Sequence, residues 1–440
     1  MANCSCKNMW KGPALMNQPA ETSYRDPHRW VVFAVICLIY FFVYFHRVST
    51  SVIVSDLLAE FNTTATALGF MSSMYFYIYA FNQPIVGYLA DRIGSRRVIA
   101  YWSITAAVGC FIFGMAPSIG WASVGRALIG FGVSGVYVPT VKALSQWFNK
   151  KAFTTMVGLL MSVGNFGAVV ATTPLAWAAG TWGWRPTFFL IGGVTLGMAI
   201  LMLTITRDPP VSTKLDQRLS DSIGTSSPNL IGNIVAIVSS LQLWLVAIIF
   251  FGIYGTAVTL QGLWATPFLM TVLDIERILA SKLNMLIPIG VIIGAPVFGW
   301  LPDRLGLNIK RVFTTITAVY TLCWLAILVA FDRLGIFGFT IIFFAMGVAI
   351  GGFISSIWGI IREITPAERL GLTSGIINPA PFLGVAFFQV LTGNILDRAG
   401  RVGELYTLSG FKSAFSICLV GVIICLVLSL FIKSHQKVMP

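Results

Sequence analysis

Arg47 is the residue whose chemistry stands out first, because its guanidinium belongs to a long apolar run. The run covers about residues 30–55, and at 1.5 Å per residue Arg47 lies only about 6 Å beyond its centre. Tyr40, Tyr44 and Ser51 are spaced so that they share its face of a helix. Phenols, a hydroxyl and a guanidinium on one face suit a carboxylate or a phosphate. The alternative is a structural arginine that pairs with a helix end or another buried group.

Other polar residues within apolar runs could complete a binding site with Arg47, although each alone is more often a packing residue. These candidates are Tyr75, Tyr79, Tyr137, Asn165, Tyr254, Gln261, Asn284 and Asn378. His46 is a candidate proton carrier, because an unperturbed histidine has a pKa of about 6.5, but its ring can equally face a neighbouring helix. Asp and Glu residues lie near the ends of the runs, so the charge opposite Arg47 would come from an anionic ligand.

The elements that must position these residues are long helices in a membrane. Of 440 residues, 57% are hydrophobic and 10% are charged, whereas soluble domains have about 25% charged residues. Apolar runs long enough for spans of about 20 residues recur along the chain. They cover approximately residues 30–55, 66–90, 98–117, 119–145, 154–179, 186–206, 242–269, 279–300, 311–331, 336–361, 371–396 and 408–432. We therefore predict an all-α polytopic membrane protein with twelve transmembrane helices in two pseudo-symmetric six-helix bundles.

A polar stretch rich in Pro, Ser and Thr divides the runs into two sets of six. The predicted organisation is an N-terminal tail (1–29), a first bundle (30–206), a linker (207–235), a second bundle (236–432) and a C-terminal tail (433–440). If the N-terminus is inside, nineteen Lys and Arg residues fall in inside segments and seven in outside segments, which predicts two cytoplasmic termini. The net charge of +13 is thus mostly a topology signal, and nucleic-acid binding loses its support.

A loop signature follows the second and the eighth runs, 212 residues apart. Its copies are Gly87-x-x-x-Asp91-Arg92-x-Gly94-x-Arg96 and Gly299-x-x-x-Asp303-Arg304-x-Gly306. The first glycine allows close helix contact and the second a tight turn, while the aspartate can accept hydrogen bonds from a helix N-terminus and pair with arginine. Such a loop is a candidate gate that holds one conformation and releases it in another. A weaker third copy, residues 393–401, falls on the opposite face, because its run points the other way.

Together these features resemble the major facilitator superfamily of secondary transporters over essentially the whole chain. The resemblance implies two bundles that rock about a midplane site and expose it to each side in turn. Arg126 opens a segment similar to the family's fourth-helix pattern Arg-x-x-x-Gly-x-Gly, which makes it a further gating candidate. Residues 44–49 look like the first-helix Asp-Arg pattern of organic-anion and sugar-phosphate members, in which the arginine binds the anion. Here His46 replaces the acid.

We therefore expect a secondary active transporter of a small organic anion, a carboxylate or phosphate ester, working by proton symport or anion exchange. An exporter of amphiphilic or cationic compounds is one alternative, although the Gly-Pro motif of drug antiporters is not clear in residues 164–174. A membrane sensor that binds its ligand without moving it is another. We expect no enzyme activity, cofactor or metal, and a monomer in the plasma membrane (the inner membrane of a diderm bacterium) whose partners are lipid, the anion and, for symport, protons. Cys4 and Cys6 could form a metal or lipid site or belong to an inert tail.

Overall fold

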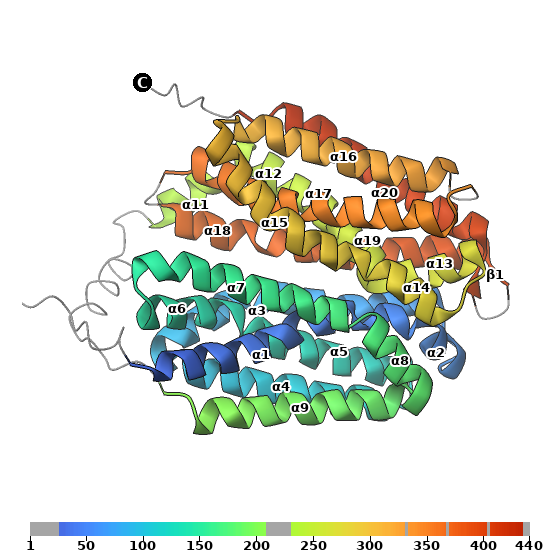
Figure 1. The fold of residues 1–440 in the computed structure, drawn as a ribbon, viewed down its shortest axis with the longest axis horizontal. Coiled ribbons are helices and arrows are strands. Elements are labelled where there is room, and N and C mark those ends of the chain that lie inside the picture. Colours follow the sequence, from blue (N-terminus) through green and yellow to red (C-terminus); the bar gives the residue numbers. More distant parts are fainter. Residues whose placement is uncertain (1–25, 208–229, 331–332, 367–368, 403–404, 434–440) are drawn as a thin grey trace, which may run out of the picture.

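The computed structural model describes residues 26–207, 230–330, 333–366, 369–402 and 405–433. Most of both predicted tails and of the linker, with Cys4 and Cys6, lies outside these residues. The described chain is almost entirely helical, and its helices form two groups, one from each half of the sequence (Figure 1).

The first bundle follows the first six predicted spans. Its elements are α1 (His28–Val48), the 3-10 helix η2 (Ser49–Val52), α2 (Val54–Glu60), α3 (Ala65–Ile93), α4 (Ser95–Met115), α5 (Ile119–Ser134), α6 (Tyr137–Trp147), α7 (Lys150–Val170), α8 (Thr173–Trp182) and α9 (Trp184–Thr204). α5 and α6 together form one span, as do α7 and α8. The break between α7 and α8 lies just before Pro174, because the proline ring and its missing N–H interrupt helical hydrogen bonding.

The second bundle follows the last six predicted spans. Its elements are α11 (Leu230–Val238), α12 (Leu241–Thr259), the π-helical turn η3 (Leu260–Trp264), α13 (Ala265–Leu273), α14 (Arg277–Asn284), α15 (Leu286–Leu305), α16 (Ile309–Ala330), α17 (Gly335–Ile364), α18 (Leu370–Ile377), α19 (Pro379–Ala399), β1 (Arg401–Val402), β2 (Leu405–Tyr406) and α20 (Leu408–Leu430). α11 overlaps the end of the predicted linker. α18 and α19 are separated at Asn378, directly before Pro379.

Among the described residues, eleven helical segments are long and apolar enough to cross a membrane. α3, at the place of the second predicted span, has 29 residues but is more polar, because it carries Asn82, Gln83 and the terminal pair Asp91–Arg92. At 1.5 Å per residue it is about 43 Å long, more than the roughly 30 Å of a bilayer's apolar core. The predicted fold class is confirmed, and the one addition is a two-residue antiparallel pair, β1–β2.

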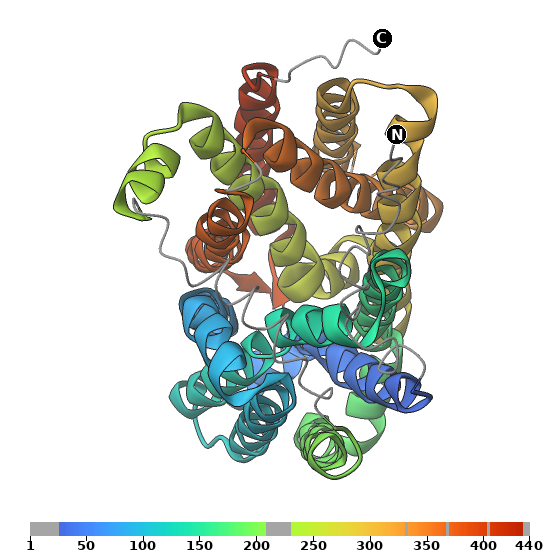
Figure 2. The ribbon, with the colours of Figure 1, turned by 90° about the vertical axis from the view of Figure 1, so that its left-hand side faces the viewer.

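The two ends of the molecule carry different elements. α1 begins and α20 ends at the end here called the terminal end, on the left of Figure 1, while α2, α8, α14 and β1 lie at the opposite, distal end. Figure 2 views the molecule from its terminal end and shows the two bundles side by side. The contacts between the two bundles at the terminal end therefore involve different elements from those at the distal end.

Glycines allow α15 and α17 to pack closely. A Cβ atom at Gly290 would lie 2.5 Å from the carbonyl oxygen of Phe344 and 2.7 Å from the amide nitrogen of Val348. These are backbone atoms of α17, and they cannot turn aside as the end of a flexible side chain can. Any side chain at Gly290 therefore has to push the two helices apart.

We predict that Gly290→Ala lowers the apparent Tm of the purified protein, because overpacking a helix contact costs about 1–3 kcal/mol. Gly193→Ala on α9 is the matched control, since a Cβ there meets no atom within 4 Å. The control should keep or raise the Tm, because alanine favours a helix over glycine by about 1 kcal/mol. Thermal unfolding of both variants in one detergent tests this, and equal Tm values would contradict it.

Candidate functional site

Arg47 lies between the two bundles, enclosed by aromatic side chains, and only 6% of it is exposed. Its Nη1 donates a 2.6 Å hydrogen bond to the hydroxyl of Tyr254 on α12. Its guanidinium carbon lies 4.5 Å from the ring centre of Tyr44, 5.8 Å from that of Tyr79 and 5.4 Å from that of Phe382. Aromatic faces attract cations, so these rings stabilise the charge. These five side chains, here called the Arg47 cluster, come from α1, α3, α12 and α19.

Among the described residues, Arg47 has no acidic partner to neutralise its charge. The ion pairs described between side chains lie elsewhere, at Lys142–Asp91, Arg185–Glu60 and Arg277–Asp56. The Nε atom of Arg47 is buried and makes no hydrogen bond within the described chain. A buried charge is costly unless it is paired and hydrogen-bonded. The cluster can therefore accept an anion, to which the guanidinium offers a fork of N–H donors and the phenols offer O–H donors.

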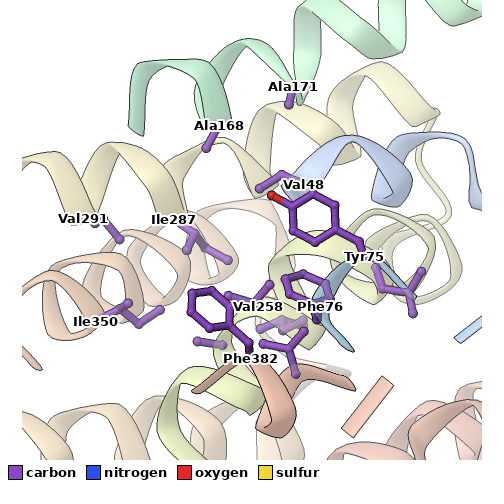
Figure 3. Packing of buried hydrophobic residues seen from close by; sticks show 14 of the residues in the cluster. Val48, Tyr75, Phe76, Ala168, Ala171, Val258, Ile287, Val291, Ile350 and Phe382 are labelled. Atoms are coloured by element: carbon purple, nitrogen blue, oxygen red, sulfur yellow. The ribbon is translucent and has the colours of Figure 1, made fainter. Parts of the chain in front are cut away.

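Apolar residues of both bundles surround this level of the molecule. Figure 3 shows Val48 and Tyr75 from the first bundle, and Val258 and Phe382 from the second. All four are buried, with at most 7% of each exposed. Because water is scarce there, charged hydrogen bonds at the Arg47 cluster are stronger than in bulk solvent.

Three of the predicted tyrosines lie together along α1 and α6. The hydroxyls of Tyr40 and Tyr44 lie 3.4 and 3.9 Å from the sulfur of Met161 on α7. The ring of Tyr137 is 5.9 Å from that of Tyr40. A thioether is only a weak acceptor, so both hydroxyls can turn to a better one. This group extends the cluster from Tyr44 toward the terminal end of α1. Met161 was not predicted as a site residue, because a methionine in an apolar run looks like any other packing residue.

Ser51, Gln261 and Asn284 also come together, on the distal side of Arg47. Nδ2 of Asn284 is 3.0 Å from the Gln261 carbonyl oxygen and 3.3 Å from Oγ of Ser51. Asn284 is fully buried, and these bonds join η2 of the first bundle to η3 and α14 of the second. In this structure the three residues close the distal side of the site.

Asn165 and Asn378 are not drawn into these groups by any hydrogen bond of the described chain. Nδ2 of Asn165 donates to the carbonyl oxygen of Met161, one turn earlier on its own helix. Asn378 lies at the junction of α18 and α19 and is half-buried. Their contribution to a binding site stays a prediction.

His46 and Arg126 form a second buried group, inside the first bundle. Nε2 of His46 is 3.8 Å from Sγ of Cys110 on α4, so the ring faces that helix. Nη1 of Arg126 donates a 2.9 Å hydrogen bond to the carbonyl oxygen of His46, and its guanidinium carbon lies 5.0 Å from the ring centre of Tyr75. The hydroxyl of Tyr75 donates to the carbonyl oxygen of Val43 on α1. Tyr75 thus ties α3 to α1, and proton transfer by His46 stays a prediction.

The loop signature forms turns at the terminal end. Gly94 and Gly306 have φ angles of +87° and +61°, which explains the glycines there. Asp91 pairs with Lys142 of its own bundle at 2.7 Å. The close helix contact expected at Gly87 is absent, because a Cβ atom there would meet nothing within 4 Å.

The arginines of the signature contact residues of their own bundles. At Gly299 a Cβ would lie 3.8 Å from Oγ of Ser355 on α17, which is an ordinary contact distance. The close approach expected there is therefore absent too, because a side chain of α17 and not its backbone faces this glycine. Arg92 and Arg304 stack on Tyr88 and Trp300, and Arg96 donates to the carbonyl oxygen of Leu203. The side chain of Asp303 lies outside the described atoms. A gating role for the signature stays a prediction.

Asp397, in the weaker third copy, joins the bundles at the distal end. Its carboxylate accepts hydrogen bonds of 2.8 Å from the backbone N–H groups of Ala65 and Thr66, and one of 2.5 Å from the Thr66 hydroxyl. These N–H groups begin α3, where free donors and the helix dipole favour a negative charge. Asp397 of the second bundle thus caps a helix of the first.

Tyr406 and Arg401 support this cap. The Tyr406 hydroxyl donates to Oδ1 of Asp397 and accepts from Arg401. Burial raises the pKa of Tyr406 to about 12, and the bond to Asp397 also raises it, so the hydroxyl stays protonated. Arg401 also donates to the carbonyl oxygen of Thr63 in the first bundle.

The polar contacts described between the bundles lie toward the distal end. Arg277 of α14 pairs with both carboxylate oxygens of Asp56 on α2, at 2.7 and 2.8 Å. Asp397, Asn284 and Arg47 also form hydrogen bonds between the bundles. All of these contacts lie between the level of Arg47 and the distal end.

Comparison with known proteins gives several similarities. The sequence model of the Major Facilitator Superfamily matches residues 36–388. The probable sulfoacetate transporter SauU of Cupriavidus necator is 28% identical over 182 residues, 41% of this chain and 42% of that protein. The Lysosomal dipeptide transporter MFSD1 of Danio rerio is 23% identical, over 97% of this chain and 92% of its own. The D-galactonate transporter of Escherichia coli is 22% identical, over 90% of this chain and 95% of its own.

The fold is also that of a solved structure. A bacterial homologue of the human lysosomal transporter Spinster, in an inward-facing and unoccupied conformation, matches with a TM-score of 0.75 at 15% identity. The match covers 92% of this chain and 97% of that one. At this level of identity the likeness concerns the arrangement of helices alone.

We predict that Asp397→Asn opens the distal end, because the amide loses the charge that caps α3. Caps of this kind are worth about 0.5–2 kcal/mol, enough to change a population several-fold. Spin labels at Thr181 on α8 and Leu279 on α14, in a cysteine-free background, report the distance across that end. Asp274→Asn is the matched control, since Asp274 is exposed and has a φ angle of +48°, a conformation that asparagine also adopts. An unchanged distance distribution in Asp397→Asn would contradict the prediction.

Proposed function

The chain belongs to the major facilitator superfamily, and from that premise we propose that it carries a small organic anion across a membrane by alternating access. Its relatives include transporters of organic anions and sugar acids. In the proposal the substrate is a carboxylate, a phosphate ester or a sulfonate, the last in keeping with the sulfoacetate transporter. The terminal end faces the cytoplasm, as the basic residues of the sequence indicate.

The Arg47 cluster is the observation that carries this proposal. A buried guanidinium that has no acidic partner in the described part of the chain attracts an anion and repels a cation. This argues against export of lipophilic cations. The bond from Arg47 to Tyr254 joins the bundles, so a bound anion that takes over this bond acts on both bundles at once. Substrate binding and bundle movement are thereby coupled.

For the driving force we propose anion exchange. When the bundles change sides, the site passes through a closed state in which Arg47 is shielded from water on both sides. An empty site then holds an unpaired charge, while a loaded site holds a neutral pair, so the loaded carrier moves faster. Proton symport needs a titrating group near the cluster, and the His46 ring faces Cys110 on α4. This supports exchange over symport.

We predict that Arg47→Gln abolishes binding and uptake of the anion while the protein stays folded. Losing one partner of a buried charged pair costs about 2–5 kcal/mol, which weakens binding at least about 30-fold. Arg47→Lys should rescue only part of it, because lysine keeps the charge without the planar fork. A thermal-shift panel of sugar acids, dicarboxylates, sulfonates and phosphate esters identifies the ligand, and liposome uptake tests it.

Arg333→Gln is the control, because Arg333 is exposed in the turn before α17. It should bind and transport as the wild type does. Uptake by Arg47→Gln at the wild-type rate would refute the anion site, and stabilisation of the wild type by lipophilic cations alone would refute the substrate class.

Exchange predicts that liposomes loaded with the anion take up labelled anion at equal pH on both sides, even with a protonophore present. Empty liposomes should take up little, with or without an inward proton gradient. Uptake into empty liposomes driven by the gradient would instead establish proton symport. In that case His46→Gln tests whether the histidine carries the proton.

A further inference from the structure

A groove of about 670 Å³ lies on the second bundle, between α15, α16 and α17. None of its lining residues belongs to the Arg47 cluster, so it is separate from the proposed transport site. α15 and α16 both pack against α17 (Figure 1), and close glycine contacts hold α15 on it. The space left between α15 and α16 is the groove.

The lining changes from apolar to polar along the groove. Phe298, Val319, Phe344 and Val348 form apolar walls, and the lining also includes Arg311, at the start of α16. At 1.5 Å per residue, Arg311 and Val319 are about 12 Å apart along the helix. The groove thus offers a long apolar slot with a cationic group at one end.

The cationic end lies in the turn between α15 and α16, at the terminal end. Residues 303–311 hold three basic residues and one acidic residue. Arg311 is exposed, and its guanidinium has no hydrogen-bond or ion-pair partner within the described chain. Lys310, next to it, donates to the carbonyl oxygen of Leu430. Arg311 is therefore available to a ligand outside the protein.

Trp300 indicates the depth of this turn in a membrane. It is 54% exposed, and the Arg304 guanidinium carbon stacks 4.7 Å from the centre of its ring. Exposed tryptophan and arginine together are typical of the headgroup region of a bilayer. Arg311 follows in the same turn, so it lies near the headgroups while the apolar slot reaches into the acyl chains.

We propose that this groove binds one anionic phospholipid, with an acyl chain in the slot and its phosphate on Arg311. The volume suits a chain-sized ligand, since ligand sites span about 300–1,000 Å³. Basic pockets between membrane helices bind anionic headgroups in this way. A zwitterionic lipid lacks the net charge, and a free phosphate lacks the chain that fills the slot. Both are therefore poor ligands.

Native mass spectrometry of the purified full chain tests the proposal. The protein is incubated with equal amounts of dioleoyl phosphatidylglycerol and dioleoyl phosphatidylcholine, and retained lipids are counted. The wild type should retain phosphatidylglycerol in preference. Arg311→Gln should reduce its retention about fivefold, since one basic residue near a membrane surface is worth about 1 kcal/mol. Arg311→Lys should keep most of it.

Two further variants separate the slot from the charge. Thr315→Trp places a large side chain on the lining from an exposed position of α16, and should reduce retention of both lipids. Arg97→Gln removes an exposed arginine near the start of α4, outside the groove, and should behave as the wild type. The apparent Tm of each variant verifies that it is folded.

Several results would overturn the proposal. Equal retention of the two lipids by the wild type, or unchanged retention by Arg311→Gln, would exclude the headgroup contact. Unchanged retention by Thr315→Trp would exclude the slot and leave only surface charge. Displacement of the lipid by an equal concentration of sn-glycerol 3-phosphate would mean that the headgroup alone is the ligand.

Discussion

A guanidinium buried between two bundles, with no carboxylate of the described residues beside it, constrains the centre of this molecule. A charged guanidinium in a low-dielectric interior is costly unless other groups stabilise it. Aromatic faces and the hydroxyl of Tyr254 surround Arg47 and stabilise its charge. The tyrosine belongs to the other bundle, so whatever stabilises the charge also determines how the bundles meet. A binding site and a movable interface are thus built from one set of atoms.

The contacts beyond this level extend the closure to the distal end. Asn284 binds Ser51, Arg277 binds Asp56, and Asp397 caps α3. All three join one bundle to the other, and all are polar contacts that water can replace when the end opens. The signature loops at the terminal end hold bonds of their own bundle, such as Asp91 with Lys142. In this conformation the aspartate of the signature therefore joins the two bundles at the distal end, whereas Asp91 at the terminal end pairs within its own bundle.

The sequence predicts the helices and the main charge, but not the partners. Long apolar runs indicate the spans because every backbone group must be satisfied within the membrane. A helical period places Tyr44 on the face of Arg47. Neither Phe382 nor the pairing of Arg47 with Tyr254, 207 residues away, has a local pattern to reveal it. The orientation of His46 needed the neighbouring helix α4, because adjacent residues of a helix point about 100° apart.

Asp397 contacts α3 mainly through backbone N–H groups, which every residue except proline provides. This contact therefore requires a particular side chain at position 397 but not at positions 65 and 66. Positions 65 and 66 can exchange many side chains without losing the bonds, whereas position 397 must keep a carboxylate. Among related sequences, the two halves of this contact should then vary at unequal rates, and paired substitutions between them should be rare. A contact that fastens two halves of a protein can thus leave little trace in sequence covariation.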